Sequence, residues 1–476
     1  MDTRAIQSAI DAANRAGGGV VLFPEGSYCS GSLRLRSNVD LHLDRNATLL
    51  GSTSRFDYQK GRWYALLLAE GQENLSISGS GTIDGRGREL VQDIVRRVGA
   101  GEIADPLTKD RPDEKQRPLL IELRRCRRVR VSGVTLRDSA CWVQNYIECQ
   151  DLRMDQVRVD STAYWNNDGM DITDCQRVRV TRCDINSADD GICLKSNVGG
   201  SGCDDVEVTD CRVRSSASAF KCGTASHAGF RNIRVRGLTV YDTFRSAVAL
   251  ESVDGGALEN VRIENVRATN TGNAVFLRLG HRNAGAPAGR LSGVVIRDVK
   301  VEIPSSPPDA GYETAGRPPR APHNPIPSSI TGIPGHPVRN VLLEDVEIVY
   351  AGGGKAAVAQ VSASDLSRVP ELPEDYPEFS MFGELPAWGF YLRHAQGIEF
   401  RKVRMHLKQS DFRPALVGDD LTGLHLDRVD LGPLSGAPAV VLNRALETVL
   451  QAVRYPQGIQ GKIVLMGGSS PVKQSR

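Results

Sequence analysis

Four stretches of the chain repeat one pattern: CRRVRVSGVTLRDS (126–139), CQDLRMDQVRVDS (149–161), CQRVRVTRCDINS (175–187) and CDDVEVTDCRVRSS (203–216). Each begins with Cys and continues as two short segments in which Val, Leu, Ile or Met alternates with Arg, Asp, Glu or Thr. Alternation with a period of two places apolar side chains on one face of a strand and polar side chains on the other. Each copy is therefore predicted to be two short strands joined by a bend.

The pattern continues on both sides of these four copies. Earlier copies are SNVDLHLDRNATLLGS (37–52) and ENLSISGSGTIDG (73–85), and later ones begin at Phe230, Leu258, Leu291, Val338, Gly397 and Leu421. A period of roughly 20–30 residues predicts a β-solenoid, in which equivalent strands stack in parallel about 4.8 Å apart. A β-sandwich is the alternative, and a propeller is weaker because its blades need about 40 residues or more.

The N-terminal segment has a different pattern. Within residues 1–19, apolar side chains recur at helical spacing, at Ile6, Ala9, Ile10 and Ala13. A helix there covers the open end of the solenoid, whose first strand otherwise exposes its edge and its apolar interior. We therefore expect an N-terminal capping helix followed by an all-β solenoid.

Two segments interrupt the repeat. Residues 304–337 contain ten of the 24 prolines, which excludes regular strands there, and residues 365–388 contain clustered aromatic residues. We expect both to be ordered loops over a groove. Residues 432–476 are expected to form a C-terminal cap or tail, and residues 1–476 a single domain.

Composition limits the function classes. The 476 residues include 59 basic and 57 acidic side chains, for a net charge of +2, so charge predicts neither a nucleic-acid nor a membrane partner. No apolar run reaches the length of a membrane span, and the first residues lack a signal peptide. We expect a secreted or periplasmic protein whose signal has been removed, with a cytoplasmic location as the alternative. Whether it is a monomer or an oligomer is not predicted.

The ten cysteines have no metal-binding spacing, so no metal site is expected from them. Cys126, Cys149, Cys175 and Cys203 recur at intervals of 23, 26 and 28 residues. An even number of cysteines in a secreted protein is consistent with disulfides. We favour the alternative, in which these are free thiols stacked at equivalent positions and packed as small apolar groups.

Carboxylates gather in two neighbouring repeats. Asp168 lies 21 residues before Asp189 and 22 before Asp190, which is about one repeat. The three side chains should therefore lie close together, repel one another and leave at least one with a raised pKa that keeps it protonated near neutrality. A neutral acid beside an ionised base is what acid–base hydrolysis requires. A structural ladder of Asn/Asp turns, or a bound Ca²⁺, is the alternative.

NNDGMDI (166–172) followed by SADDGICLKS (187–196) resembles the NTDGxDI…GDDCxxxxS signature of glycoside hydrolase family 28, the polygalacturonase family of right-handed parallel β-helices. Residues 5–52 and GSGTIDGRG (79–87) are also similar to that family, and the resemblance runs from about residue 2 to 431. It implies a right-handed parallel β-helix and a cofactor-independent hydrolase that inverts the anomeric carbon. Its carbohydrate partner is pectic.

By the same resemblance, Asp189 is the general acid that protonates the leaving oxygen. Asp168 and Asp190 share the activation of water, and Asn166 helps to position water or substrate. The family's inversion is not predicted by the spacing, because inverting carboxylates usually lie about 6.5–9.5 Å apart and adjacent repeats bring side chains closer.

Two family motifs are missing. The G-H-G motif aligns with residues 216–223, which contain no His, and the R-I-K motif aligns with Ala249-Leu250-Glu251. Loss of these cations weakens binding of a uronate carboxylate. Either Lys195 and Lys221 replace them, or the sugar there is neutral and Glu251 hydrogen-bonds its hydroxyl groups. This places simple polygalacturonase activity in doubt and favours a pectin side chain or a rhamnogalacturonan-type glycoside.

Weaker binding candidates flank these motifs. His227 is expected either to replace the missing His or to cap a turn. Trp165, with Trp142 and Tyr164, is expected either to stack on a sugar ring or to pack within the fold.

We therefore expect a glycosidase, and the two long loops favour exo action on chain ends. A polysaccharide lyase or epimerase on the same fold is one alternative. A non-catalytic carbohydrate-binding solenoid is another.

Overall fold

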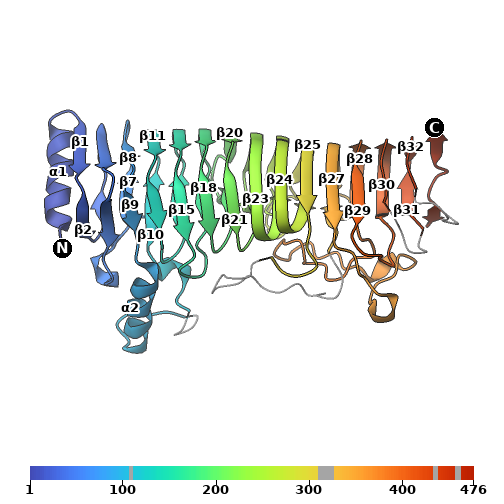
Figure 1. Ribbon diagram of the computed structural model, residues 1–476, viewed down its shortest axis with the longest axis horizontal. Helices are drawn as coiled ribbons and strands as arrows, with labels where there is room; N and C mark the ends of the chain where they lie inside the picture. Colours follow the sequence, from blue (N-terminus) through green and yellow to red (C-terminus); the bar gives the residue numbers. More distant parts are fainter. Residues whose placement is uncertain (107–110, 309–325, 433–437, 456–461, 476) are drawn as a thin grey trace. The chain divides into compact units, whose positions relative to one another are not determined.

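The computed structural model describes residues 1–106, 111–308, 326–432, 438–455 and 462–475. These residues group into two compact units, and Figure 1 labels their helices and strands. The first unit contains residues 1–195 and 203–217, and the second contains the described residues of 196–202, 218–310 and 317–476. Whether the chain forms a single domain stays a prediction.

The expected N-terminal helix, α1 (Thr3–Arg15), is present in the first unit. Its Ile6 and Ile10 are buried, and it contacts β1 (Gly19–Phe23), β3 (Leu33–Arg34) and β4 (Val39–Leu43). The side chain of Gln7 accepts a hydrogen bond from the backbone N–H of Arg34 at 2.8 Å and donates to its carbonyl at 3.0 Å. The helix therefore supplies both an apolar cover and hydrogen-bond partners to the end of the strand stack.

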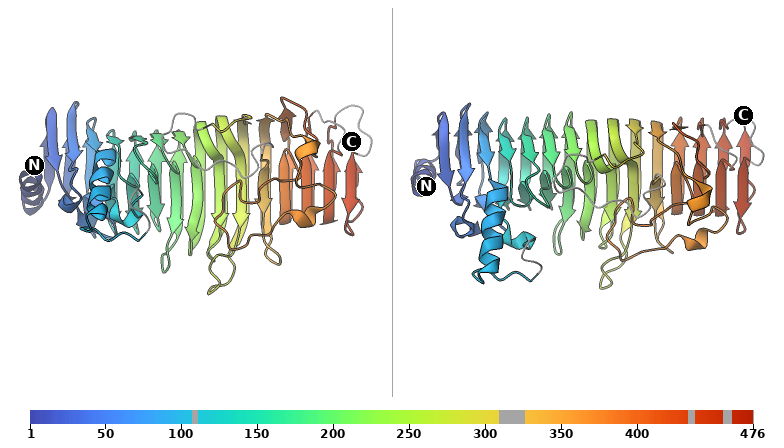
Figure 2. Two further views of the ribbon diagram at one scale, coloured as in Figure 1. Left: turned by 90° about the horizontal axis from the view of Figure 1, so that it is seen from below. Right: turned by 60° about the horizontal axis from the view of Figure 1, so that its bottom comes forward.

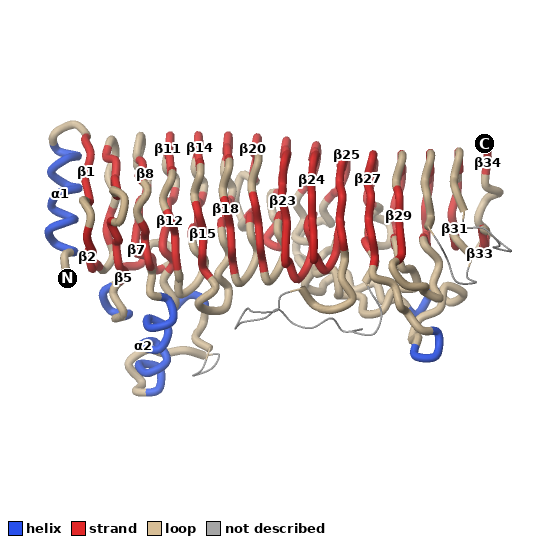
Figure 3. The backbone as a smooth tube through the Cα atoms, viewed as in Figure 1, coloured by secondary structure: helices blue, strands red, loops and turns tan. Residues whose placement is uncertain are grey.

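The strands of the first unit form three parallel ladders (Figure 3). The first ladder contains β3, β7 (Tyr64–Glu70), β10 (Leu119–Arg124), β13 (Gln144–Ile147), β16 (Met170–Thr173) and β19 (Ile192–Ser196). The second contains β1, β4, β8 (Ser76–Gly79), β11 (Arg127–Ser132), β14 (Gln150–Asp155), β17 (Gln176–Thr181) and β20 (Cys203–Thr209). The third contains β2 (Gly26–Ser30), β5 (Ala47–Gly51), β9 (Thr82–Asp84), β12 (Thr135–Arg137), β15 (Arg158–Ser161), β18 (Asp184–Ser187) and β21 (Arg212–Ser215).

Pairing in register explains the repeat seen in the sequence. Val129, Leu152, Val178 and Val206 occupy one position on four successive strands of the second ladder, and all four are buried. One repeat of sequence is thus one turn of chain, and its alternating apolar residues build a continuous core.

The sequence pattern identified the second and third ladders but not the first. Every residue of β13 and β16 is buried, including polar ones such as Asn145 and Asp171, and each strand is only four residues long. A strand covered on both faces leaves no period-two signal.

Two elements of the first unit lie outside the ladders. Strand β6 (Gln59–Lys60) pairs antiparallel with β7. Helix α2 (Gly87–Gly99) projects beside β10 and stands clear of the strands (Figures 1 and 2). The chain between α2 and β10 includes the short 3-10 helix η2 (Glu114–Gln116).

The second unit is also built from parallel strands. They are β22 (Phe220–Ser226), β23 (Gly229–Ser252), β24 (Ala257–Leu279), β25 (Arg290–Glu302), β26 (Ser328–Thr331), β27 (Val338–Tyr350), β28 (Phe390–Arg401), β29 (Arg404–Leu407), β30 (Leu416–Asp427), β31 (Val440–Leu446), β32 (Val449–Gln451), β33 (Ile463–Met466) and β34 (Lys473–Ser475). The expected C-terminal segment contains β31 to β34, which continue the parallel pairing from β30.

The two interruptions of the repeat differ. In residues 304–337 the expectation of no strand is wrong for β26, because no proline interrupts Ser328–Thr331; residues 309–325 lie outside the described part. Residues 365–388 are ordered, as expected, and bury Phe379, Met381, Phe382 and Leu385 in an apolar cluster with Tyr391 of β28.

All ten cysteines are free thiols, and nine of them are buried, with Cys29 in an intermediate position. Cys149 and Cys175 touch, since the Cys149 N–H lies 3.3 Å from the Cys175 sulfur. The prediction of stacked free thiols is confirmed. Burial raises the pKa of Cys149 well above its usual value, which makes the thiol unreactive.

No helix among the described residues is long and apolar enough to cross a membrane.

The thiol arrangement predicts a labelling pattern. A thiol-specific reagent such as DTNB is expected to label one thiol, Cys29, in the native protein and all ten in denaturant, because only Cys29 reaches the surface. Cys29→Ser should remove the fast phase. Rapid native labelling of several thiols, or fewer than ten under non-reducing denaturation, would contradict the burial or the free state of the thiols.

Candidate active site

Three carboxylates meet at the start of two neighbouring strands of the first unit. Asp168 stands two residues before β16 and Asp190 two residues before β19, and the register pairs Met170 with Ile192. One oxygen from each of Asp168, Asp189 and Asp190 lies within 4.8 Å of the others. The convergence expected from the one-repeat spacing is therefore observed.

Tight turns hold these carboxylates in place. The N–H of Gly169 donates to the carbonyl of Asp190 at 2.8 Å, and a Cβ at Gly169 would stand 2.5 Å from the Ile185 side chain. Buried Asn167 donates to the carbonyls of Ser139 and Cys141 at 2.9 and 2.8 Å. The Asn and Gly of the motif thus hold the backbone on either side of Asp168.

Lys195 lies inside the cluster. Its Nζ is 3.2 Å from an oxygen of Asp168 and 2.9 Å from one of Asp171, and 4.7 Å from the centre of the Trp142 ring. In this structure the ammonium is shared by protein carboxylates, and its predicted contact with a substrate carboxylate stays a prediction. Asp171, fully buried in β16, was not identified from the sequence, because a polar residue at an alternating position is expected to face solvent.

Burial dominates the electrostatics of this group. Burial, together with the charges of Asp171, Asp189 and Asp190, raises the pKa of Asp168 well above its usual value, against the opposing charge of Lys195. Burial also raises the pKa of Asp171 to about 6 although Lys195 acts to lower it. Burial lowers the pKa of Lys195, but the carboxylates, Asp171 first, hold it well above its usual value. At least one carboxyl of raised pKa was expected in this group, and Asp168 is such a carboxyl.

Asn166 lies against Asp189, as the family motif implies. Its backbone is in the left-handed region, with φ of 57°, and its amide nitrogen donates to Asp189 Oδ2 at 3.4 Å. The other oxygen of Asp189 accepts from the N–H of Asp190 at 2.9 Å.

Arg117 orients this amide and was not identified from the sequence. It is 1% exposed, and its Nη2 donates to Asn166 Oδ1 at 2.8 Å. It also donates to three backbone carbonyls, those of Pro112 at 3.0 Å, Ala140 at 3.2 Å and Trp165 at 2.5 Å. Because the amide oxygen faces Arg117, the amide nitrogen must face Asp189. An isolated Arg outside the repeats gives no sequence signal for this role.

The loop that carries Arg117 brings two more groups to the site. The guanidinium of Arg111 lies 4.5 Å from the centre of the Trp165 ring, so Trp165 contacts this loop. Burial raises the pKa of Glu114, and the charge of Asp189 adds to the effect. Glu114 is therefore a fourth carboxyl in the electrostatic environment of Asp189.

Lys221 and Glu251 belong to the second unit. Both are almost fully buried, and Lys221 Nζ lies 3.8 Å from Glu251 Oε2. Lys221 also donates to the hydroxyl of Tyr376 at 3.2 Å, which comes from the ordered loop 365–388. These residues form a second polar group whose opposite charges offset each other.

His227 is held at the end of a strand. Its backbone N–H donates to the carbonyl of Ser196, the last residue of β19, at 3.1 Å, whereas Asp189 and Asp190 precede the first residue of β19. Its predicted role as a replacement for the missing His stays a prediction.

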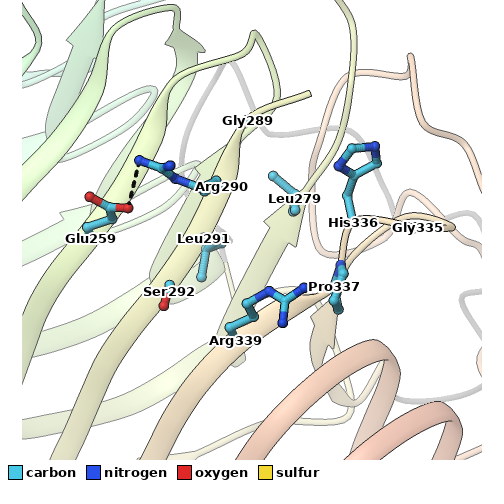
Figure 4. A pocket seen from close by; sticks show the side chains of 10 residues that line it. All are labelled: Glu259, Leu279, Gly289, Arg290, Leu291, Ser292, Gly335, His336, Pro337 and Arg339. Atoms are coloured by element: carbon cyan, nitrogen blue, oxygen red, sulfur yellow. Dashed lines mark ion pairs between the residues drawn. The ribbon is translucent and has the colours of Figure 1, made fainter. Parts of the chain in front are cut away.

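A cavity of ≈ 430 Å³ in the second unit is lined by none of the predicted site residues (Figure 4). It is lined by the start of β25, the turn before β27 and an ion pair of 3.1 Å between Arg290 and Glu259. Its size alone does not make it the reaction site, because it contains no pair of carboxyl groups suited to acid–base work.

The raised pKa of Asp171 predicts how stability depends on pH. The folded protein keeps this proton up to about pH 6, whereas the unfolded chain loses it near pH 4. The resulting contribution is present at low pH and is lost as pH rises through 6. Between pH 4.5 and 7.5 this loss should lower the free energy of unfolding of the parent by about 1–3 kcal/mol. Asp171→Asn should abolish that decrease, as measured by urea titration at each pH.

Asp151→Asn is the matched control, because Asp151 is exposed and paired with Arg177. It should keep the decrease. Equal pH slopes in the parent and in Asp171→Asn would contradict the buried, proton-binding state of Asp171.

The buried guanidinium predicts a second stability effect. Arg117→Met should lower the free energy of unfolding by about 2–4 kcal/mol, because it leaves buried carbonyl groups without donors. Arg130→Met, on the exposed face of β11, should change it by less than about 0.5 kcal/mol. Similar losses in the two variants would refute the structural role of Arg117.

Comparison with known proteins places this site in a family. The model of glycosyl hydrolases family 28 matches residues 20–307. A probable polygalacturonase of Vitis vinifera is 26% identical over 60% of this chain and 55% of its own length. An exopolygalacturonase of Zea mays is 24% identical over 75% of this chain and 82% of its own. The chain therefore spans only about half the length of the grape protein.

Among solved structures, a family 28 exopolygalacturonase of Yersinia enterocolitica superposes with a TM-score of 0.59 over 93% of this chain and 74% of that one, at 18% identity. This likeness concerns the fold alone. Together with the match to more than half of the chain, the motifs around Asp168 and Asp189 lead to one conclusion. The chain belongs to glycosyl hydrolases family 28.

Proposed function

We propose that this protein hydrolyses a glycosidic bond in pectic polysaccharides or oligosaccharides by a single displacement. The observation that carries the proposal is the convergence of Asp168, Asp189 and Asp190 within 4.8 Å at the start of two neighbouring strands. We also predict that the strands wind in a right-handed sense and that the protein is secreted or periplasmic.

In the proposed reaction Asp189 gives its proton to the leaving glycosidic oxygen as the bond to the anomeric carbon breaks. Asp168 and Asp190 hold a water molecule, whose oxygen bonds to the anomeric carbon while one of its protons passes to the carboxylate that acts as base. Asn166, turned toward Asp189 by Arg117, keeps the acid in position. No cofactor is required by this sequence of steps.

The arrangement of charge supports a substrate other than plain polygalacturonate. At the positions where the family motifs supply cations, this chain has Glu251, and its charge is offset by Lys221 at 3.8 Å. An offset pair attracts a uronate carboxylate less than a free cation does. A pectic side chain or a rhamnogalacturonan-type linkage is therefore proposed, with Glu251 accepting from sugar hydroxyl groups.

Exo action is part of the proposal. The ordered loop 365–388 is tied down by Arg278, which donates to the carbonyls of Glu371 and Leu372 at 2.7 and 2.9 Å. A fixed loop is suited to close one end of a groove. Several relatives of this chain are named exopolygalacturonases.

The test is a panel of defined galacturonan, xylogalacturonan and rhamnogalacturonan oligosaccharides. At least one should be cleaved by the parent, with the inverted anomer appearing first by NMR and with release from chain ends. Asp189→Asn should lower kcat by about 10²–10⁴-fold, since it removes the proton donor. Asp151→Asn, a distant exposed substitution, should leave kcat unchanged.

Other outcomes point to other chemistry. An unsaturated product absorbing near 235 nm, abolished by a chelator, would indicate a lyase, whose cation the three Asp side chains are close enough to hold. Saccharide binding without turnover would indicate a binding protein. A retained anomeric configuration would overturn the single displacement.

A further inference from the structure

Two tryptophans stand beside the carboxylates of the first unit. Trp63 and Trp142 have ring centroids 5.2 Å apart and planes inclined at 44°. Both pack against a small apolar cluster of Ala65, Leu68, Leu119 and Cys141, and both remain partly exposed. They are therefore fixed from the inner side and reachable from solvent.

Strand register aligns Trp142 with the reacting groups. Asn145 pairs with Asp171, and Met170 pairs with Ile192, so Trp142, Asp168 and Asp190 occupy equivalent positions, each two residues before its strand, β13, β16 or β19. Adjacent positions in such a ladder are about 4.8 Å apart. The Trp142 ring also covers Lys195, which is itself bound to Asp168. The aromatic surface thus begins one strand away from the carboxylates.

A buried glutamate holds the other ring in place. Glu122, 2% exposed, accepts from the backbone N–H groups of Arg62 and Trp63, each at 2.7 Å. Gly61 leaves room for it, because a Cβ there would stand 2.1 Å from a Glu122 oxygen. Burying a carboxylate to fix a surface turn is costly, and its effect here is to fix the backbone that carries Trp63.

We propose that Trp63 and Trp142 form a subsite that stacks on one pyranose ring of the substrate, next to the ring whose glycosidic bond lies at Asp168 and Asp189. Aromatic rings bind the apolar face of a sugar while its hydroxyl groups stay solvated. The subsite therefore selects ring shape and not charge, and it takes a neutral sugar as well as a uronate. This inference rests on the proposed hydrolase function.

The binding test uses the Asp189→Asn protein and two probes, trigalacturonate and β-1,4-galactotriose. Binding of each probe is measured by the change in tryptophan fluorescence. At least one probe should give a saturable change. Trp63→Ala and Trp142→Ala should each weaken binding at least tenfold, and the Phe variants should stay within threefold of the parent. Phe56→Ala is the control, since Phe56 is an exposed aromatic residue with Arg97 against one face of its ring. Thermal melts exclude misfolded variants.

In the active protein the Ala variants should raise KM about tenfold with kcat within threefold, on the substrate that the parent cleaves. Unchanged KM and unchanged binding would overturn the subsite while leaving the hydrolase intact. Tryptophan-dependent binding in a protein that cleaves nothing would overturn the hydrolase and leave the subsite. No fluorescence change with either probe would also overturn the subsite.

Discussion

Parallel hydrogen bonding between equivalent strands is the interaction on which the rest of the structure depends. It converts a sequence separation of one repeat into a spatial separation of one strand, so that residues 20 or more positions apart become neighbours. Asp168 and Asp190 meet for this reason, and Trp142 joins the same position one strand earlier. The same register stacks Val129 on Leu152 in the core. The same in-register pairing therefore builds both the apolar core and the carboxylate cluster.

Charge balance determines what this alignment can do. Four aspartates at the starts of two neighbouring strands would repel strongly if all were ionised. Lys195 lies between Asp168 and Asp171, and burial favours a proton on Asp168. The cluster therefore combines buried carboxyl groups of raised pKa with a neighbouring ammonium. Acid–base work relies on environments that separate the pKa values of neighbouring groups.

Loops set apart from the repeats supply the side chains that turn a common fold into a particular site. Arg117 and Glu114 come from the chain after α2, Trp63 from the turn before β7, and Tyr376 from the ordered segment 365–388. Arg117 and the backbone of Trp63 are held by buried polar partners. Loops of this kind are where functional differences between proteins of one fold usually arise.

The sequence alone determined the repeat, the parallel stacking, the N-terminal helix and the pairing of Asp168 with Asp189 and Asp190, because these depend on periodicity and on spacing along one regular path. Only the tertiary structure decided the first ladder, since β13 and β16 are four residues long and buried on both faces. It also decided the partners of Lys195 and the place of Arg117. Those contacts join residues at irregular separations, such as Arg117 and Asn166, and no local pattern records which side chain a loop brings to which strand.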